Sequence, residues 1–267
     1  MSLKLSEIWI YPIKSMAGIA LDRADVLSKG LRFDRRFMLA DDHGVAITQR
    51  EVPQLALCRP AINDHNIEVR YGDAFIKIPL APQSGRIINA SVWGDAIQAI
   101  EVDEEISRWF CEALNISCRL LYFPEHHARP VDAKYQISEE NVSLADAFPF
   151  LIIGESTLAD LNERLDSPIP MNRFRPNFVF SGGKAFAEDT WFEFSIGDCH
   201  FTAMKRCARC IIITTDQETT QRSAEPLRTL ATYRGENNKV YFGQNVLHRK
   251  GNSVKIGDEI NVHSYKS

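Results

Sequence analysis

Short runs of β-branched and aromatic residues, separated by turn residues, recur along this chain and limit its fold more than any other feature. The runs lie at residues 5–12, 37–40, 45–48, 55–57, 67–71, 75–78, 178–180, 191–194, 199–202, 210–215, 239–242 and 253–262. Turn-forming sequences such as 41–44, 63–64 and 72–73 divide them. Many short strands with frequent turns are typical of a β-barrel or a β-sandwich.

Three segments space their apolar residues like helices instead. At residues 104–115 five apolar side chains fall on one face, and at 157–165 three leucines do the same. Thr157 and Asp160 have the spacing of a capping box at the start of the second helix. A third helix is expected at 226–233. The sequence therefore predicts an α+β chain that is predominantly β, with two lobes and a few covering helices.

A stretch without strand or helix spacing lies near the middle of the chain, at residues 121–143. We expect a loop there and place the domain boundary in it. A chain of 267 residues has room for two ordinary domains. The expected domains are residues 1–122 and 123–267.

Composition and charge exclude several classes of protein. The chain is 45% hydrophobic and 25% charged, which is typical of a soluble globular protein, and its net charge of −4 gives no reason to expect nucleic acid or an anionic membrane as a partner. We see no signal peptide and no apolar run long enough to span a membrane. Four of the six cysteines, Cys58, Cys111, Cys118 and Cys199, are scattered; with no secretory signal, we expect a reduced, cytoplasmic protein.

Cys207 and Cys210 form a close thiol pair, preceded by the basic residues 205–206 and followed by the apolar run 211–215. Cationic neighbours favour the thiolate, the form that attacks electrophiles or binds soft metals. The simpler alternative is a pair of small, partly buried hydrophobic residues. A zinc site is disfavoured because the only other close pair is His126-His127, and a thioredoxin-like dithiol is disfavoured because the pair leads into an expected strand.

Four short segments carry polar chemistry without the periodicity of a core element: residues 11–15, 33–37, 172–177 and 242–245. They contain lysine and arginine, which make charge-assisted bonds to phosphate or carboxylate, and serine and asparagine, which orient polar ring edges. Alone, each segment is more often a surface ion pair or a turn. Together with the thiol pair, they predict one site for an anionic ligand beside sulfur.

Six motifs occur here in the order in which the MOSC family has them. They are Tyr11-Pro12 with Lys14-Ser15, Asp34-Arg35, residues 174–177, Cys207-Ala208-Arg209-Cys210 with Thr214-Thr215, residues 225–230 and residues 242–245. The MOSC domain is the domain at the C-terminus of molybdenum cofactor sulfurases. The chain most resembles the bacterial N-hydroxylated-compound reductases of this family and the mitochondrial amidoxime-reducing component. The resemblance covers the whole chain and implies an N-terminal MOSC β-barrel domain followed by the MOSC domain proper.

This resemblance implies a molybdenum cofactor of the molybdopterin type. Cys210 matches the cysteine that ligates molybdenum and is the expected catalytic residue. The positions that match cofactor contacts, chiefly to phosphate and pterin, are Lys14, Ser15, Arg35, Asp146, Arg175, Asn177, Arg209 and Asn245. Asp146 lies where the family has a loop on the cofactor side. Ala208 stands where relatives have serine, so one side-chain contact is expected to be lost.

The implied reaction is the reduction of N-hydroxylated compounds to the N–H product and water. The sequence has no four-cysteine spacing for an iron–sulfur cluster, so electrons are expected from a separate flavin reductase or ferredoxin-type protein. Asp34, Asp146 and His248 are the candidate proton donors, and the choice among them stays open. Two other functions also remain open: a persulfide carrier that uses Cys210 or Cys207, and a carrier of molybdenum cofactor without turnover.

Overall fold

The computed structural model describes residues 2–82 and 85–266, and it is predominantly β. Nine strands belong to one sheet: β1 (Lys4–Ile10), β2 (Ile19–Leu21), β12 (Phe150–Gly154), β13 (Phe178–Ser181), β14 (Trp191–Ile196), β15 (Cys199–Arg209), β16 (Gly235–Glu236), β17 (Lys239–Lys250) and β19 (Ile260–Tyr265). The sheet order is β19-β14-β15-β17-β12-β13-β1-β2, and β16 pairs with β17. Only the β12–β13 pair within this sheet is parallel among the described pairings.

The other strands form three smaller sheets. They are β5 (Phe37–Ala40), β11 (Arg119–Tyr122), β10 (Asp95–Glu101) and β9 (Ile87–Val92) in the first, β18 (Ser253–Lys255), β3 (Arg23–Leu27) and β4 (Gly30–Leu31) in the second, and β6 (Arg59–Ile62), β7 (Asn66–Tyr71) and β8 (Ala74–Pro79) in the third. The α-helices are α1 (Glu104–Leu114), α2 (Glu155–Asn162) and α3 (Leu227–Arg234). The 3-10 helices are η1 (Pro53–Leu57), η2 (Ala133–Tyr135), η3 (Met171–Arg173), η4 (Ala187–Thr190) and η5 (Ile211–Thr214).

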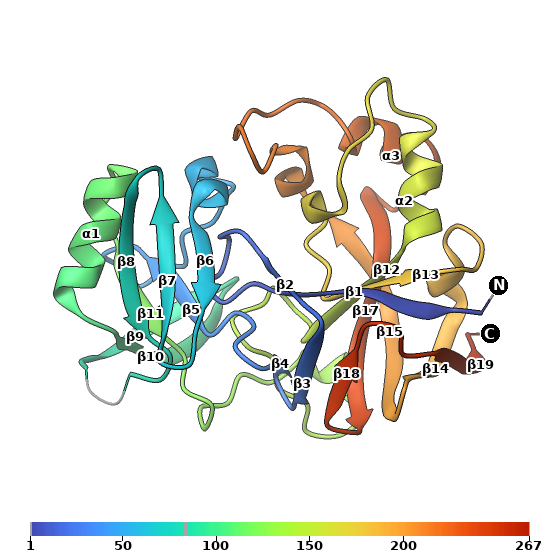
Figure 1. Cartoon of the computed structure of the whole chain (residues 1–267), viewed down its shortest axis with the longest axis horizontal. Helices are drawn as coiled ribbons and strands as arrows, with labels where there is room; N and C mark the ends of the chain where they lie inside the picture. The colour runs from blue at the N-terminus through green and yellow to red at the C-terminus, as the bar shows by residue number, and fades with distance from the viewer. Residues whose placement is uncertain (1, 83–84, 267) are drawn as a thin grey trace.

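Two lobes lie side by side, as the sequence predicts. Figure 1 shows β5 to β11 with α1 in the left lobe, and the large sheet with α2 and α3 in the right lobe. The first strand nevertheless belongs to the right lobe, because β1 pairs antiparallel with β13 and Ile8 lies opposite Phe178. The chain then crosses toward the other lobe, and residues 11–15 lie at this crossing.

Each lobe has its own apolar core. In the right lobe, buried aromatic rings pack against one another, with ring centroids 5.5 Å apart for Phe150–Phe178 and for Phe178–Phe201. In the left lobe, α1 buries Phe110 against the strands, with Phe37 in the same cluster. Large buried rings contribute much of the stability of such cores. The strands that lead into the polar segments are therefore held in place by these packed cores.

The helix predictions are confirmed for 104–115 and 226–233, which appear as α1 and α3. The carboxylate of Asp103 caps α1 by accepting from the backbone N–H groups of the first turn. The capping box predicted for α2 is wrong. That helix starts at Glu155, and the hydroxyl of Thr157 is buried and donates to Glu188 over 3.0 Å.

Three strand predictions are wrong. Residues 55–57 belong to η1, which Pro53 begins, and residues 45–48 make only isolated bridges. Residues 210–215 are not a strand, because β15 ends at Arg209 and the run coils into η5 to bury Ile213. Residues 210–215 have the β-branched composition of a strand, so tertiary burial, and not composition, decided their backbone conformation.

Two further predictions concern connections. Residues 253–262 form two strands, β18 and β19, separated by a turn in which Gly257 has a φ of +89°. The predicted central loop is confirmed apart from its first two residues, which end β11, and η2. None of the helices in the described part of the chain has the length and apolar character that a membrane span needs.

Candidate functional site

A cleft of about 780 Å³, measured out to its open mouth, is lined by segments from both halves of the chain. All nine residues that the sequence singled out line this one cleft: Lys14, Ser15, Arg35, Asp146, Arg175, Asn177, Arg209, Cys210 and Asn245. Cys207, Phe148 and Phe174 also line it. The structure therefore brings the polar segments and the thiol pair together, and the roles of the individual residues remain predictions.

The ammonium of Lys14 is held inside the cleft wall by two oxygens. Its Nζ lies 2.6 Å from Oδ1 of Asp146 and 2.8 Å from the carbonyl oxygen of Leu144, and Lys14 is 5% exposed. Burial lowers the pKa of Lys14 below its usual value, although the Asp146 carboxylate opposes this shift. A second anion beside Lys14 would further stabilise its charge, so Lys14 suits an anionic ligand.

The Asp146 carboxylate faces the open space of the cleft, and 61% of its side chain is exposed. Enclosure by protein opposes its ionisation, but the Lys14 ammonium and the indole N–H of Trp93, 2.8 Å from Oδ1, together hold the pKa of Asp146 well below its usual range. The carboxylate is therefore ionised at neutral pH.

Arg35 and Arg175 both lie over the ring of Tyr11, each with its guanidinium carbon 4.2 Å from the ring centroid. Arg35 is paired with Asp34 over 2.6 Å, whereas no carboxylate of the described residues lies within ion-pair distance of the Arg175 guanidinium. Burial lowers the pKa of Arg175 to about 10. Arg175 is half-buried, and a guanidinium of this kind without a carboxylate partner is suited to binding phosphate or carboxylate.

Three of these residues share an unusual backbone conformation. Ser15, Arg35 and Arg175 have φ angles of +67°, +49° and +55°, in the left-handed region that residues other than glycine seldom adopt. Such strain persists only where the surrounding structure imposes it, and it concentrates at ligand sites. The polar segments are therefore shaped as loops around a ligand space and do not continue the strands before them.

The thiol pair lies where β15 gives way to η5. Arg209, the last residue of β15, donates to the sulfur of Cys207 over 3.1 Å and to the carbonyl oxygen of Phe174 over 2.7 Å, while its buried Nε has no partner. Cys207 and Cys210 are partly exposed, unlike the buried Cys58. The two cleft thiols are therefore the accessible ones beside fixed positive charge.

The two predicted asparagines, Asn177 and Asn245, both line the cleft, but Asn177 is already bound to the backbone of two strands. The Asn177 side chain links β1 to β12, because its amide donates to the carbonyl oxygen of Trp9 and accepts from the N–H of Leu151. The Asn177 side chain therefore holds β1 and β12 together as well as lining the cleft. Asn245 stands on β17, with its side chain toward the cleft.

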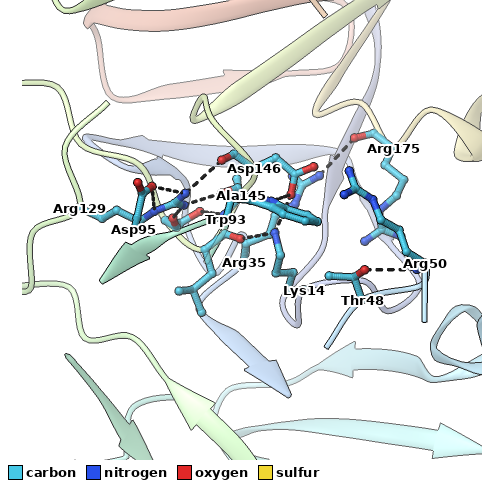
Figure 2. A network of polar contacts seen from close by, with 12 residues as sticks. Lys14, Arg35, Thr48, Arg50, Trp93, Asp95, Arg129, Ala145, Asp146 and Arg175 are labelled. Carbon is cyan, nitrogen blue, oxygen red and sulfur yellow. Dashed lines mark hydrogen bonds and ion pairs between the residues drawn. The ribbon is translucent and has the colours of Figure 1, made fainter. Parts of the chain in front are cut away.

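Two residues around the site were missed from the sequence, Trp93 and Arg129. Arg129 donates through Nε and Nη2 to Oδ2 of Asp95, over 2.9 and 2.8 Å (Figure 2). Its other bonds go to the carbonyl oxygens of Ser143, Ala145 and Asp146, over 2.8, 2.5 and 3.0 Å. Arg129 thus fastens the Asp146 loop to the β9–β10 hairpin that carries Trp93. No local motif marks a residue whose partners are backbone carbonyls.

The donors in the cleft fit the cofactor that the sequence implies. The buried Nε of Arg209 has no acceptor, and the Arg175 guanidinium has no carboxylate partner among the described residues; a phosphate or a polar pterin edge would supply acceptors to both. Cys210 offers a sulfur atom, a soft ligand that suits a metal already bound by sulfur.

The fold and the cleft together define a two-lobed β protein in which a cleft lined by basic side chains also holds two partly exposed thiols. The chain belongs to the MOSC family: residues 2–117 match the MOSC N-terminal beta barrel domain and residues 139–261 match the MOSC domain.

Named relatives fall into two groups. The chain is 32% identical to mitochondrial amidoxime-reducing component 1 of Mus musculus, in an alignment that covers 96% of this chain and 81% of that protein. It is 31% identical to molybdenum cofactor sulfurase of Arabidopsis thaliana, over 96% of this chain and 35% of that protein. Among solved structures, the YuaD protein of Bacillus subtilis has 12% identity and a TM-score of 0.49, with 100% of this chain and 98% of that chain covered.

Proposed function

We propose that this protein binds molybdenum cofactor and reduces N-hydroxylated compounds to the N–H product and water. The supporting observation is that Cys210 shares one cleft with the unpartnered Arg175 guanidinium. The similarity to a protein named as an amidoxime-reducing component, over almost the whole chain, supports the same class of substrate.

Residues from both proposed domains, 1–122 and 123–267, would hold the cofactor. Lys14, Arg35 and Arg175 would bind its phosphate and polar ring edges, and Cys210 would provide a thiolate to the metal. The cofactor, when bound, supplies the two-electron redox chemistry that amino-acid side chains lack. The protein supplies the charge, the fixed thiolate and the shape of the site.

The reaction consumes two electrons and two protons for each N–O bond broken, and it yields an amine or amidine and water. A separate flavin reductase or ferredoxin-type protein would deliver the electrons. Of the three candidate proton donors, Asp146 lines the cleft, whereas Asp34 is buried under Arg35 and His248 does not line it. Because Asp146 stays ionised, it suits orienting a substrate N–H better than releasing a proton.

The test is to purify the chain from a host that makes molybdenum cofactor and to measure molybdenum and pterin per protein. The wild type is expected to hold nearly one of each. Cys210→Ala is expected to lose most of its molybdenum and its reduction of a hydroxylated purine, while Cys207→Ala, the matched neighbouring thiol, keeps the metal. Full activity of Cys210→Ala would contradict the proposal.

A persulfide carrier is the second candidate, and the contact of Arg209 with the sulfur of Cys207 favours it. A preparation without molybdenum and pterin, but with sulfane sulfur on these thiols, would support that function. A chain that holds the cofactor but is not reoxidised by any N-hydroxylated compound would be a carrier. We also infer a cytoplasmic location, which the six free cysteines support and cell fractionation tests.

A further inference from the structure

We propose that Arg50 and Trp93 form a substrate subsite at the rim of the cleft, and that it selects N-hydroxylated compounds carrying an anionic group. This inference rests on the proposed function and adds the substrate class to it. Neither residue belongs to the motifs that mark the cofactor site.

Arg50 has a free guanidinium that is fixed in direction. Its guanidinium carbon lies 4.1 Å from the centroid of the Trp93 ring, which is the geometry of a cation–π contact. No carboxylate of residues 2–82 or 85–266 lies within ion-pair distance of it, and its buried Nε has no hydrogen-bond partner. An arginine stacked on a ring keeps its in-plane donors available for a planar anion.

Trp93 connects this arginine to the cleft. Its indole N–H donates to Asp146, and Lys14 Nζ lies 5.5 Å from the same ring (Figure 2). Two cations thus lie over one indole, with Asp146 as the neighbouring carboxylate. Trp93 as a whole is 45% exposed, so part of its side chain is open to contact with a ligand.

The backbone at Trp93 is held in an unfavourable conformation. Its φ is +56°, which is costly for a bulky aromatic residue, at the tip of the hairpin between β9 and β10. The adjacent Asp95 is fixed by Arg129, so the tip cannot relax freely. A strained, exposed and braced aromatic residue beside a ligand cleft points to a binding role.

The loop that carries Arg50 is braced just as firmly. Buried Gln49 donates to the carbonyl oxygen of Ser15 over 2.7 Å and exchanges hydrogen bonds with Gln217. Arg222 donates to the carbonyl oxygens of Gln49 and Arg50. The loop is thereby tied both to the Lys14-Ser15 turn and to the segment that follows the thiols. Arg50 is not itself a lining residue of the cleft, but it keeps a defined position next to it, stacked on the Trp93 ring whose N–H binds the lining residue Asp146.

A substrate with a carboxylate or phosphate on or near a planar ring matches this arrangement. The anion accepts hydrogen bonds from Arg50, and the ring packs against the exposed indole. A neutral analogue of the same shape leaves the guanidinium unpaired, so the site discriminates by charge. Charge-assisted hydrogen bonds of this kind correspond to roughly tenfold or more in affinity.

The test compares two pairs of substrates with cofactor-loaded enzyme and an artificial electron donor. One pair is benzamidoxime and 4-carboxybenzamidoxime, and the other is N6-hydroxyadenosine and its 5′-monophosphate, so that carboxylate and phosphate are distinguished. The wild type is expected to favour the anionic member of at least one pair about tenfold or more in kcat/KM, mainly through KM. In Arg50→Gln this ratio is expected to fall close to one, and in Arg50→Lys to fall partway.

Arg70→Gln is the matched control, because Arg70 also stacks on an aromatic ring, that of Phe75, but is already paired with Glu68 on β7, and it should leave the ratio unchanged. A second measurement uses the unreactive probe 4-carboxybenzamide with protein free of cofactor. We expect it to quench tryptophan fluorescence, the quenching to disappear in Trp93→Phe, and the affinity to fall in Arg50→Gln.

Each outcome separates this inference from the proposed function. Turnover with no preference for the anionic member, or an equal loss for both members in Arg50→Gln, overturns the subsite and leaves the reductase intact. Binding of the probe that depends on Arg50, in an enzyme that reduces no N-hydroxylated compound, supports the anion site and overturns the reductase. Absence of both binding and turnover overturns both.

Discussion

The Lys14 ammonium and the Asp146 carboxylate, 132 residues apart in sequence, lie 2.6 Å from each other in the cleft. The contact is asymmetric, because Lys14 is buried whereas Asp146 is open to the cleft. Lys14 is thus the residue whose charge depends on a partner, and Asp146 is the partner that a ligand could share.

Lys14→Met is expected to separate ligand binding from stability. The Asp146 carboxylate keeps the Trp93 N–H and the solvent, but the buried carbonyl of Leu144 loses its partner, so the free energy of unfolding should fall by about 1–2 kcal/mol. The bound cofactor should fall about tenfold, because a charge-assisted bond to phosphate is lost. Pterin content and urea denaturation measure the two effects. The control is Lys134→Met, an exposed lysine paired with Asp132, and equal pterin in both variants would contradict the prediction.

Arg129→Gln is expected to release the Asp146 loop. Arg129 is 2% exposed and makes five hydrogen bonds, so its loss leaves buried carbonyl groups unpaired at a cost of about 3 kcal/mol. Arg86→Gln removes an arginine that is mostly exposed and paired with Glu101, and should cost no more than about 1 kcal/mol. The urea midpoints of the two variants, compared at an unchanged m-value, measure both effects. Equal midpoints would contradict the proposed role of Arg129 in holding the Asp146 loop.

Gly18→Ala is expected to disturb the arginine pair through Tyr11. An added methyl group would lie 2.6 Å from Cε1 of the buried Tyr11 ring, over which Arg35 and Arg175 stack. Overpacking of this kind costs about 1–3 kcal/mol and should also reduce cofactor retention. In a Tyr11→Val background the same methyl group should cost less. A double-mutant cycle in thermal or urea unfolding measures this coupling, and strict additivity would argue against it.

Glu188 predicts a pH dependence of stability. Its carboxyl is fully buried and accepts from the N–H of Gly154 and the hydroxyl of Thr157, and burial raises the pKa from 4.5 to about 7. The folded state therefore binds the proton more tightly than the unfolded state. Stability from this group is complete below about pH 4.5, falls as the pH rises to about 7 and is constant above, with a total change of about 3 kcal/mol.

Glu188→Gln keeps the hydrogen-bonding shape and removes the titration. The difference in unfolding free energy between wild type and this variant should therefore shift by about 3 kcal/mol between pH 4.5 and 8, in favour of the variant at the higher pH. Parallel stability curves over that range would show that Glu188 does not titrate there.

The sequence predicted the elements whose apolar periodicity matches the face that they bury. It did not predict segments whose burial depends on residues far away in the sequence. The apolar face of residues 104–115 predicted α1 correctly. Residues 210–215 have the same β-branched composition as a strand, but the chain turns there so that Ile213 packs with Phe174 and Phe242. Local composition does not report which distant residues will cover a side chain.

The site was predicted from ordered motifs, and all nine residues line one cleft. Their binding of the cofactor stays a prediction. Trp93 and Arg129 could not be predicted, because one acts from the tip of a hairpin in the other lobe and the second binds mainly backbone carbonyls. Their partners are set by tertiary placement, which residue type alone does not encode.

The pairing of β1 with β13 also fixes an order of events during biosynthesis. β1 leaves the ribosome first, but its partner edge exists only after Phe178 has been made, and Asn245 completes the cleft later still. Until β13 has been made, the edge of β1 that pairs with it stays unpaired. An intermediate with an unpaired strand edge favours chaperone binding and mispairing. If the cleft holds the cofactor as proposed, its loading follows the synthesis of Asn245 and is therefore a late event in the maturation of the protein.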